Sequence, residues 1–421
     1  MPAAYQEFAE GLLPQGAQGY GGHRERRDLS KKDAILVKRY ATRRRFSDFA
    51  KFVTLPVGPQ ACIILPMLAI SRASLLFFTL LFFGFGAATA HAQQPWTFAV
   101  SGDSRNCGDV IMPAIAAGIH KDHAAFYWHL GDFRAIYDFD QDYKQLSTAP
   151  TLIIDYEKNA WDDFIQSQLE PFADTTVYLA IGNHELIPPK NRSDYLIQFA
   201  DWLDTPQIRE QRLRDNAKDH RLHTYYHWQR GGIDFITLDS SSADQFDSEQ
   251  MAWFERVLAA DSKDSGIATL VVGMHEALPD SIASDHSMNA SAQAEASGRR
   301  AYGDLLKLQQ ASKKNVYVLA SHSHFFMEGI FDTDYWRTHG GVLPGWIVGT
   351  AGAVRYTLPP KVGDAKAAKT NVYGYLLATV HSDHTIDFRF HELQESDVPV
   401  AIASRFSQDF VHQCFIGNRS N

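Results

Sequence analysis

Hydrophobic and polar residues follow a recurring order after residue 92. A short run of apolar, β-branched and aromatic residues stops at Gly or Ser, and polar side chains follow directly. Each apolar run predicts a buried strand. The five runs are WTFAVSGDSR at 96–105, AAFYWHLGDFR at 124–134, TVYLAIGNHE at 176–185, ATLVVGMHE at 268–276 and NVYVLASHSHF at 315–325.

Helical spacing appears between these strands. In the segment 248–258, apolar residues recur at intervals of three and four behind Ser248, which predicts a capped amphipathic helix. Strands that alternate with helices predict a layered α/β fold, in which ligands bind at the carboxyl ends of strands. Neither a repeat nor a low-complexity linker interrupts 93–421, so this stretch is expected to form one domain.

The segment before the first strand has the pattern of a secretory signal. No charged residue occurs from Ala73 to Ala90, Arg72 precedes this apolar run, and Ala90-His91-Ala92 gives the small-x-small cleavage pattern. We predict a signal peptide over 67–92, cleaved after Ala92, and a periplasmic or secreted protein. The basic segment 1–66 is then expected to lie upstream of the true protein. The alternative is an uncleaved membrane anchor behind a basic tail, and a membrane-anchored protein.

Charge is distributed unevenly along the chain. Residues 1–92 contain 12 Lys and Arg against 6 Asp and Glu, whereas the remaining residues contain 28 against 43 and carry a net charge of -15. An acidic surface disfavours general nucleic-acid binding, so an anionic substrate needs local positive charge from arginines or metal ions. Cys107 and Cys414 remain after the predicted cleavage. The sequence leaves open whether these two cysteines form one disulfide or stay as two buried free thiols.

The polar residues at the strand ends form an inventory of metal ligands. Carboxylate, amide and imidazole groups together suit Mn, Fe or Zn better than Ca or Mg. A single histidine at a strand end is more often structural, and it is the joint occurrence that favours metal. Six ligands exceed the need of one ion, and two ions are a standard device for clamping a phosphoryl group. The candidate ligands are Asp103, Asp132, Asn183, His275, His322 and His324.

Five motifs, GDSR, GDFR, GNHE, GMHE and SHSH, occur in this order at the strand ends and resemble those of the calcineurin-like metallophosphoesterase superfamily, including its purple acid phosphatase branch. The resemblance covers nearly all of 96–390. It implies a four-layer α/β/β/α sandwich of two mixed sheets flanked by helices. It also implies a phosphoric ester hydrolase with two transition-metal ions, a metal-activated hydroxide as nucleophile and a phosphorylated small molecule as substrate.

The resemblance also implies residue roles. Asp132 would bridge the two ions, Asp103 and His324 would hold the first ion, and the second ion would be held by Asn183, His275 and His322. His184 would stay off the metals and give its proton to the leaving oxygen. Glu185 would orient a neighbouring imidazole.

One departure from the family pattern affects the first ion. The usual ligand histidine two residues after Asp103 is replaced by Arg105, and Ala135 stands where the purple acid phosphatase branch has a tyrosine. Arginine cannot ligate a metal ion. The first site is therefore weak, filled by water, or completed by Asn106, Tyr137 or Asp138. We expect Arg105 either to bind a substrate phosphate or to be an ordinary paired arginine.

This departure supports a second hypothesis for function. A protein of the same fold with one ion, or without catalysis, would bind a phosphorylated ligand and not hydrolyse it. The substrate has no signature in the sequence. Specificity is expected in loops over 137–170, 186–222 and 277–300, which carry no readable motif.

Overall fold

The computed structural model describes residues 94–148, 150–241, 246–360 and 362–419. The chain divides into two units, Met1–Ala87 and Ala88–Asn421, and all described residues belong to the second. The predicted upstream segment 1–66 and signal peptide 67–92 lie outside the described residues, so export stays a prediction. Within the described ranges, no helix combines the length and the apolar character that crossing a membrane requires.

The described residues form two sheets, and the first of them has five strands. They are β1 (Trp96–Ser101), β2 (Phe126–His129), β3 (Thr176–Leu179), β11 (Gly374–Val380) and β12 (Ile386–Glu392). Their order is β12-β11-β1-β2-β3. β1, β2 and β3 run parallel, whereas β11 is antiparallel to β1 and to β12. The sheet is therefore mixed.

The second sheet has seven strands. They are β4 (Tyr226–Arg230), β5 (Ile233–Thr237), β6 (Thr269–Gly273), β7 (Asn315–Ala320), β8 (Phe326–Glu328), β9 (Gly345–Val348) and β10 (Ala367–Lys369). Their order is β10-β8-β9-β7-β6-β5-β4. β5, β6, β7 and β9 are parallel, and β4, β8 and β10 pair antiparallel with their neighbours.

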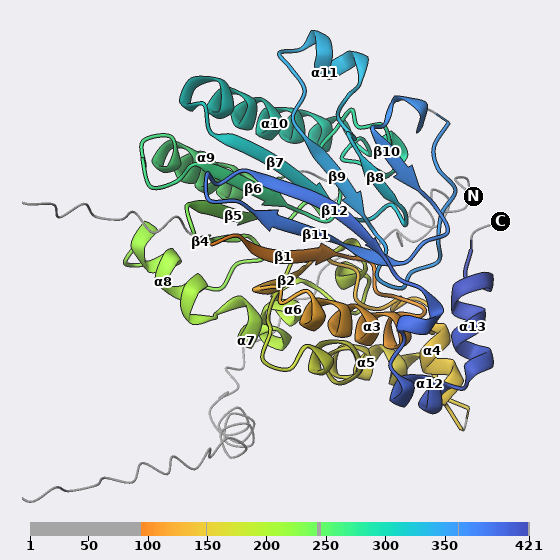
Figure 1. The fold of residues 1–421 in the computed structure, drawn as a ribbon. Helices are drawn as coiled ribbons and strands as arrows, with labels where there is room; N and C mark the ends of the chain where they lie inside the picture. Colours follow the sequence, from red (N-terminus) through yellow and green to blue (C-terminus); the bar gives the residue numbers. More distant parts are fainter. Residues whose placement is uncertain (1–93, 149, 242–245, 361, 420–421) are drawn as a thin grey trace, which may run out of the picture. The chain divides into compact units, whose positions relative to one another are not determined.

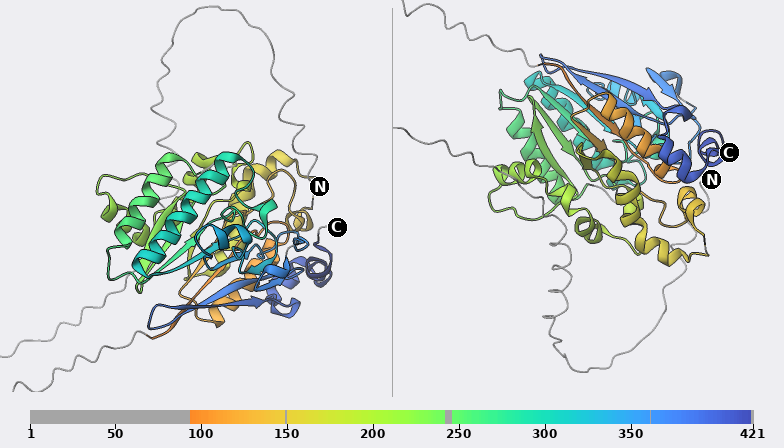
Figure 2. Two further views of the ribbon diagram at one scale, coloured as in Figure 1. Left: turned by 90° about the horizontal axis from the view of Figure 1, so that it is seen from above. Right: turned by 60° about the horizontal axis from the view of Figure 1, so that its bottom comes forward.

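Helices cover the outer face of each sheet. Figures 1 and 2 show α9 (Ser248–Asp261) and α10 (Ala292–Ser312) over the seven-stranded sheet, and α3 (Gly108–Lys121) over the five-stranded sheet. The other helices are α4 (Gln141–Leu146), α5 (Ile153–Phe164), α6 (Arg192–Gln198), α7 (Ala200–Leu203), α8 (Pro206–Asp215), α11 (Asp334–Thr338), α12 (Val400–Phe406) and α13 (Gln408–Gly417). Short π or 3-10 turns are η1 (Ile165–Leu169), η2 (Glu170–Phe172), η3 (Asn183–Leu186), η4 (Ser284–His286), η5 (Val362–Asp364) and η6 (Glu395–Asp397).

Aromatic side chains fill the space between the sheets. Phe98 of β1 meets Phe235 of β5 edge-on, with ring centroids 5.1 Å apart. Tyr178 of β3 stacks on Trp228 of β4 at 3.8 Å. Such pairs add to the hydrophobic gain of burying large rings. The predicted sandwich of two mixed sheets flanked by helices is confirmed.

The five predicted strands correspond to β1, β2, β3, β6 and β7. The helix predicted over 248–258 is α9, whose first turn is capped by Asp247 accepting from the Gln250 backbone N–H at 2.7 Å. The predicted loops were wrong in one respect: they contain α4 to α8 and the start of α10. In α5, for example, Tyr156, Ala160 and Phe164 recur every four residues on a buried face, so helical spacing was present without a motif.

A disulfide joins Cys107 and Cys414, whose Cα atoms are 6.0 Å apart across 307 positions of sequence. It connects the turn after β1 to α13. Of the two alternatives left open by the sequence, the structure has the disulfide.

Candidate metal centre

Parallel strands of both sheets end at the same edge, and sharp turns follow them. Asp103 after β1, Asp132 after β2 and His322 after β7 have φ values of 61°, 61° and 62°. This left-handed conformation is uncommon for residues other than glycine, and functional sites are where such strain is retained. The three turns therefore place two carboxylates and one imidazole directly after the ends of β1, β2 and β7.

Two motif glycines allow the turns to approach one another. A Cβ on Gly102 would overlap the hydroxyl of Ser321, and a Cβ on Gly182 would overlap the Asp132 carboxylate. The Ser321 hydroxyl donates a hydrogen bond to Asp103 Oδ2. The glycines of GDSR and GNHE are therefore needed for the close packing of the site itself.

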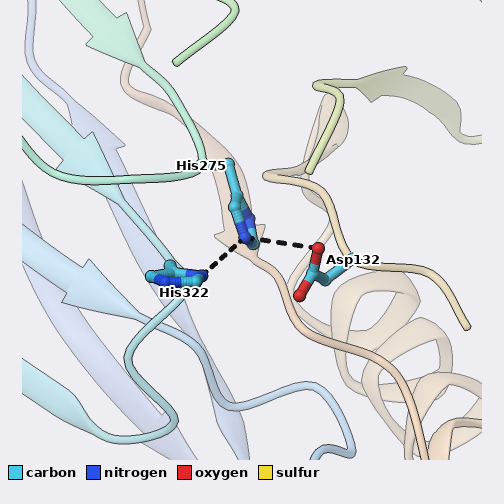
Figure 3. A group of neighbouring side chains, drawn as sticks. All are labelled: Asp132, His275 and His322. Carbon is cyan, nitrogen blue, oxygen red and sulfur yellow. Dashed lines mark hydrogen bonds and ion pairs between the residues drawn. The ribbon is translucent and has the colours of Figure 1, made fainter. Parts of the chain in front are cut away.

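Four side chains converge on what we call the second position, which is formed by Asp132 Oδ1, Asn183 Oδ1, His275 Nε2 and His322 Nδ1. His275 Nε2 lies 2.9 Å from Asn183 Oδ1, 3.3 Å from Asp132 Oδ1 and 2.9 Å from His322 Nδ1. Ligand atoms of Asp132, His275 and His322 all lie within 4.8 Å of one another. Figure 3 shows these three side chains meeting from three separate segments.

Hydrogen bonding shows that the second position is rich in acceptors. His275 Nδ1 donates to the Leu130 carbonyl at 2.9 Å, which directs Nε2 at the cluster and leaves it a lone pair in the neutral form of the ring. Around that lone pair stand a carboxylate oxygen, an amide oxygen and a second imidazole nitrogen. A bound cation would satisfy all four atoms together, so the donor set fits a transition metal.

Electrostatics keep the Asp132 carboxylate charged. Burial alone would raise the pKa of Asp132, but His184, His275 and Arg105 outweigh it and lower that pKa to about 2. Burial lowers the pKa of His322 well below its usual value, with a further contribution from His275. A charged carboxylate and a neutral imidazole are the forms that bind metal ions.

The first position is formed by Asp103 Oδ1, Asp132 Oδ2 and His324 Nε2. Asp103 Oδ2 accepts from the His322 backbone N–H at 2.7 Å, whereas Asp103 Oδ1 lies 3.2 Å from His324 Nε2. Both Asp103 Oδ1 and Asp132 Oδ2 are buried and make no hydrogen bond. Buried carboxylate oxygens without hydrogen bonds are energetically unfavourable unless a positive charge lies beside them.

Arg105 lies at this first position. Its Nη2 is 2.9 Å from His324 Nε2, its Nη1 bonds to His184 Nε2, and its Nε is 3.8 Å from Asp132 Oδ2. The residue is 7% exposed. Burial would lower the pKa of Arg105, but Asp132 outweighs it and raises that pKa. A permanent positive charge therefore faces the carboxylates of the site.

His184 contacts Arg105 through its ring, and its Nε2 lies 3.7 Å from Asp132 Oδ2. Its Nδ1 donates to the Ala135 carbonyl at 2.7 Å, so Nε2 is left to accept from Arg105. Burial, with a further contribution from Arg105, lowers the pKa of His184 to about 4. That His184 donates a proton to the leaving oxygen stays a prediction. In the arrangement described here, Nε2 of His184 accepts a hydrogen bond and carries no proton.

The three residues considered for completing the first site make other contacts in this structure. The Asn106 amide oxygen accepts from the Val354 backbone N–H at 3.1 Å. Asp138 is exposed and pairs with Lys144 at 3.5 Å. Tyr137 is 55% exposed and packs its ring 5.2 Å from that of His184. The side chain that contacts His324 Nε2 at the first position is Arg105.

Sequence reasoning missed several contributors to the site. Tyr356 stacks on His324 with centroids 3.9 Å apart, and His286 lies 5.4 Å from His322. Both come from segments without a motif, so no local signal marked them. The expected role of Glu185 was wrong: its carboxylate accepts from backbone N–H groups, not from an imidazole. These donors are the backbone N–H groups of Gly182, Asp132 and Phe133, at 2.8, 2.9 and 2.9 Å.

Comparison with solved structures finds several of similar fold. A purple acid phosphatase from yellow lupin (Lupinus luteus) seeds is 18% identical, with 70% of this chain and 52% of that chain covered and a TM-score of 0.48. PhoD is 14% identical, with 76% of this chain and 77% of that chain covered and a TM-score of 0.46. A dimetal phosphatase from Danio rerio is 11% identical, with 71% of this chain and 98% of that chain covered and a TM-score of 0.41.

The chain spans about half the length of the lupin protein. No family model and no curated protein matches the sequence. Because all three of these identities are below 20% and all three TM-scores are below 0.5, what the chain does has to be inferred from its own residues.

Proposed function

We propose that the chain is an exported, metal-dependent phosphoric ester hydrolase that acts on a phosphorylated small molecule. The observation that carries this proposal is the convergence of Asp132, His275 and His322 within 4.8 Å at the ends of separate strands. Orphaned carboxylate oxygens beside them supply the negative charge that a metal ion would balance.

Each residue of the centre has a part in this proposal. Asp132, Asn183, His275 and His322 would hold a metal ion at the second position. When bound, such an ion lowers the pKa of water and offsets charge on a phosphoryl group. Arg105 offers guanidinium donors to phosphoryl oxygens. Mn, Fe and Zn all suit this donor set. The sequence-based expectation of two ions stays a prediction.

Export rests on two features. The sequence predicts a signal peptide over 67–92, and a disulfide joins Cys107 and Cys414, which is the usual state in oxidising compartments. The net charge of -15 after residue 92 favours a small anionic substrate that is held locally by cations over a nucleic acid. A mature N-terminus near Gln93 in exported protein would support this assignment, and retention of the apolar segment would favour a membrane anchor.

Turnover of p-nitrophenyl phosphate and of its bis ester tests the proposed activity. We expect protein loaded with Mn, Fe or Zn to hydrolyse at least one of them, and a chelator to abolish the activity until metal is restored. Asp132→Ala and His322→Ala should each lower kcat/KM by about 10³-fold or more, since each removes a metal ligand. His381→Ala, at an exposed histidine paired with Asp387, is the matched control. Unchanged turnover in both site variants would refute the proposal.

One observation favours a second candidate function, a binding protein for phosphorylated ligands. Arg105 occupies the first position, where the family pattern has a ligand histidine, and this arrangement suits anion capture without hydrolysis. Binding of phosphate esters with no turnover under any of the three metals would favour this candidate. Hydrolysis of either chromogenic ester would exclude it.

A further inference from the structure

The guanidinium of Arg105 uses the lone pairs that a metal ion at the first position would need. His324 Nδ1 donates to the Val354 carbonyl at 2.6 Å, which makes its Nε2 an acceptor, and Arg105 Nη2 lies 2.9 Å from that Nε2. His184 Nε2 is likewise engaged by Nη1. An arginine donates five hydrogen bonds and accepts none, so it replaces a cation and cannot ligate one.

The turn that carries Arg105 is held in place on both sides. The Arg105 carbonyl accepts from the Cys107 backbone N–H at 2.8 Å, and Cys107 is fixed by its disulfide to Cys414. The next residue, Asn106, donates its backbone N–H to Asp140 Oδ1 at 2.6 Å. The position of the guanidinium is thus built into the fold, and it does not depend on one surface contact.

The contacts of Arg105 also leave donor capacity unused. Its Nε is buried and has no hydrogen-bond partner, and the nearest carboxylate oxygen, Asp132 Oδ2, is 3.8 Å away. A buried donor without a partner is costly unless a ligand satisfies it. A tetrahedral oxyanion beside the second position would supply acceptor oxygens to this group.

We propose that the chain binds a single metal ion, at the second position, and that Arg105 is the other positive charge of the centre, bound to a non-bridging oxygen of the phosphate. This inference rests on the proposed phosphoesterase function and replaces its second ion by a side chain. The residues of the first position do not fit a metal ion in this chain, because Arg105 stands among Asp103, Asp132 and His324.

Metal counting tests the number of ions. After loading with Mn²⁺ and dialysis, mass spectrometry should find one ion per wild-type chain, with the electron paramagnetic resonance signal of an isolated ion. Arg105→His restores the ligand of the family pattern and should bring the count to two, with an exchange-coupled signal. Arg209→His, at an exposed arginine paired with Asp204, should keep the count at one. Two coupled ions in the wild type would overturn the proposal.

Inorganic phosphate tests the role of the guanidinium. Calorimetric titration of the Mn²⁺-loaded protein should show phosphate affinity falling by about 10- to 100-fold in Arg105→Ala, with the metal count still one. Arg105→Lys keeps the charge and loses the fork, so an intermediate loss is expected and shows that the site remains folded. Equal phosphate affinity in the wild type and in Arg105→Ala would overturn the proposal.

The outcomes separate this inference from the proposed function. Two ions together with ester hydrolysis would refute the single-ion centre and leave the phosphoesterase intact. One ion, with phosphate affinity that depends on Arg105 but no hydrolysis of any ester, would refute the phosphoesterase and support the single-ion centre. No bound ion would refute both.

Discussion

The chain contains the sequence Gly-Asp-x-Arg twice, after the adjacent parallel strands β1 and β2, and the two arginines have opposite surroundings. Asp103 and Asp132 have the same φ of 61°. Arg134, two residues after Asp132, is fully buried and contacts Asp109 at 2.6 Å and Asp142 at 3.2 Å; Asp140 and Asp163 are also near. Arg105 meets two imidazoles and one carboxylate oxygen at 3.8 Å.

The difference shows that local sequence places an arginine but distant residues decide what it does. Around Arg134, four carboxylates leave no need for a ligand to balance the charge of the guanidinium. Around Arg105, the carboxylate oxygens Asp103 Oδ1 and Asp132 Oδ2 remain without hydrogen bonds, whereas the Nε of both arginines is buried without an acceptor. The first arrangement is a structural ion cluster, and the second has the unsatisfied groups of a binding site.

The largest expected effect on stability comes from replacing Arg134, whose charge is balanced by the surrounding carboxylates. Arg134→Met leaves several carboxylates buried without their counter-ion, so we expect the free energy of unfolding to fall by about 3–5 kcal/mol. Arg105→Met in the metal-loaded protein should change it by less than about 1 kcal/mol, because a bound ion still balances Asp132. Urea unfolding of both variants measures this contrast. Equal losses would mean that both arginines are structural.

A buried histidine outside the site extends the comparison to imidazoles. His227 Nε2 lies 2.6 Å from Asp215 Oδ2 and Nδ1 lies 2.7 Å from Asp234 Oδ2, so both nitrogens are paired with carboxylates. Burial alone would lower the pKa of His227, but Asp234 and Asp215 outweigh it and raise that pKa to about 10. Like Arg134, this group is balanced within the fold.

The raised pKa of His227 fixes how its contribution to the free energy of unfolding depends on pH. A folded-state pKa above the unfolded value of about 6.5 stabilises the protein fully below pH 6.5, and the contribution is lost as pH rises through about 10. We expect the advantage of the wild type over His227→Asn to shrink by about 3 kcal/mol between pH 6.5 and 9. Urea unfolding at several pH values measures it. A constant difference would show that His227 is neutral in the folded protein.

The smallest expected effect concerns the disulfide behind the Arg105 turn. Exchanging Cys107 and Cys414 together for serine should lower the free energy of unfolding by about 2 kcal/mol, at the low end for disulfides. The reason is that Arg355 also holds α13, through the Cys414 and Phe415 carbonyls at 3.2 and 2.8 Å. Phosphate affinity should fall in this variant, since the turn that carries Arg105 loses an anchor. Unchanged affinity would show that the other bonds of the turn suffice.

Much of this fold was predictable from local pattern. Each of the five strand predictions rested on an apolar run that ends at glycine or serine, and each corresponds to a strand. The structure brings all six predicted ligands to one edge of the sandwich, together with Arg105 and His184. Whether they bind metal stays a prediction.

The remaining features depend on contacts between residues far apart in sequence. Arg105 meets His324 across 219 positions, and Cys107 meets Cys414 across 307. No spacing rule relates such pairs. Tyr356 and His286 line the site from segments whose local sequence resembles ordinary surface loops. The helices α4 to α8 were missed because no motif accompanies them, although α5 carries apolar residues at helical spacing.

Crystals of the Mn²⁺-loaded protein grown with vanadate, a phosphate analogue, would test the central claim most directly. We predict one anomalous-scattering peak for manganese, among Asp132, Asn183, His275 and His322, with a vanadate oxygen hydrogen-bonded to the Arg105 guanidinium. A second manganese peak among Asp103, Asp132 and His324, with Arg105 displaced from them, would contradict the single-ion centre. The absence of any peak at the four ligands would contradict the metal site itself.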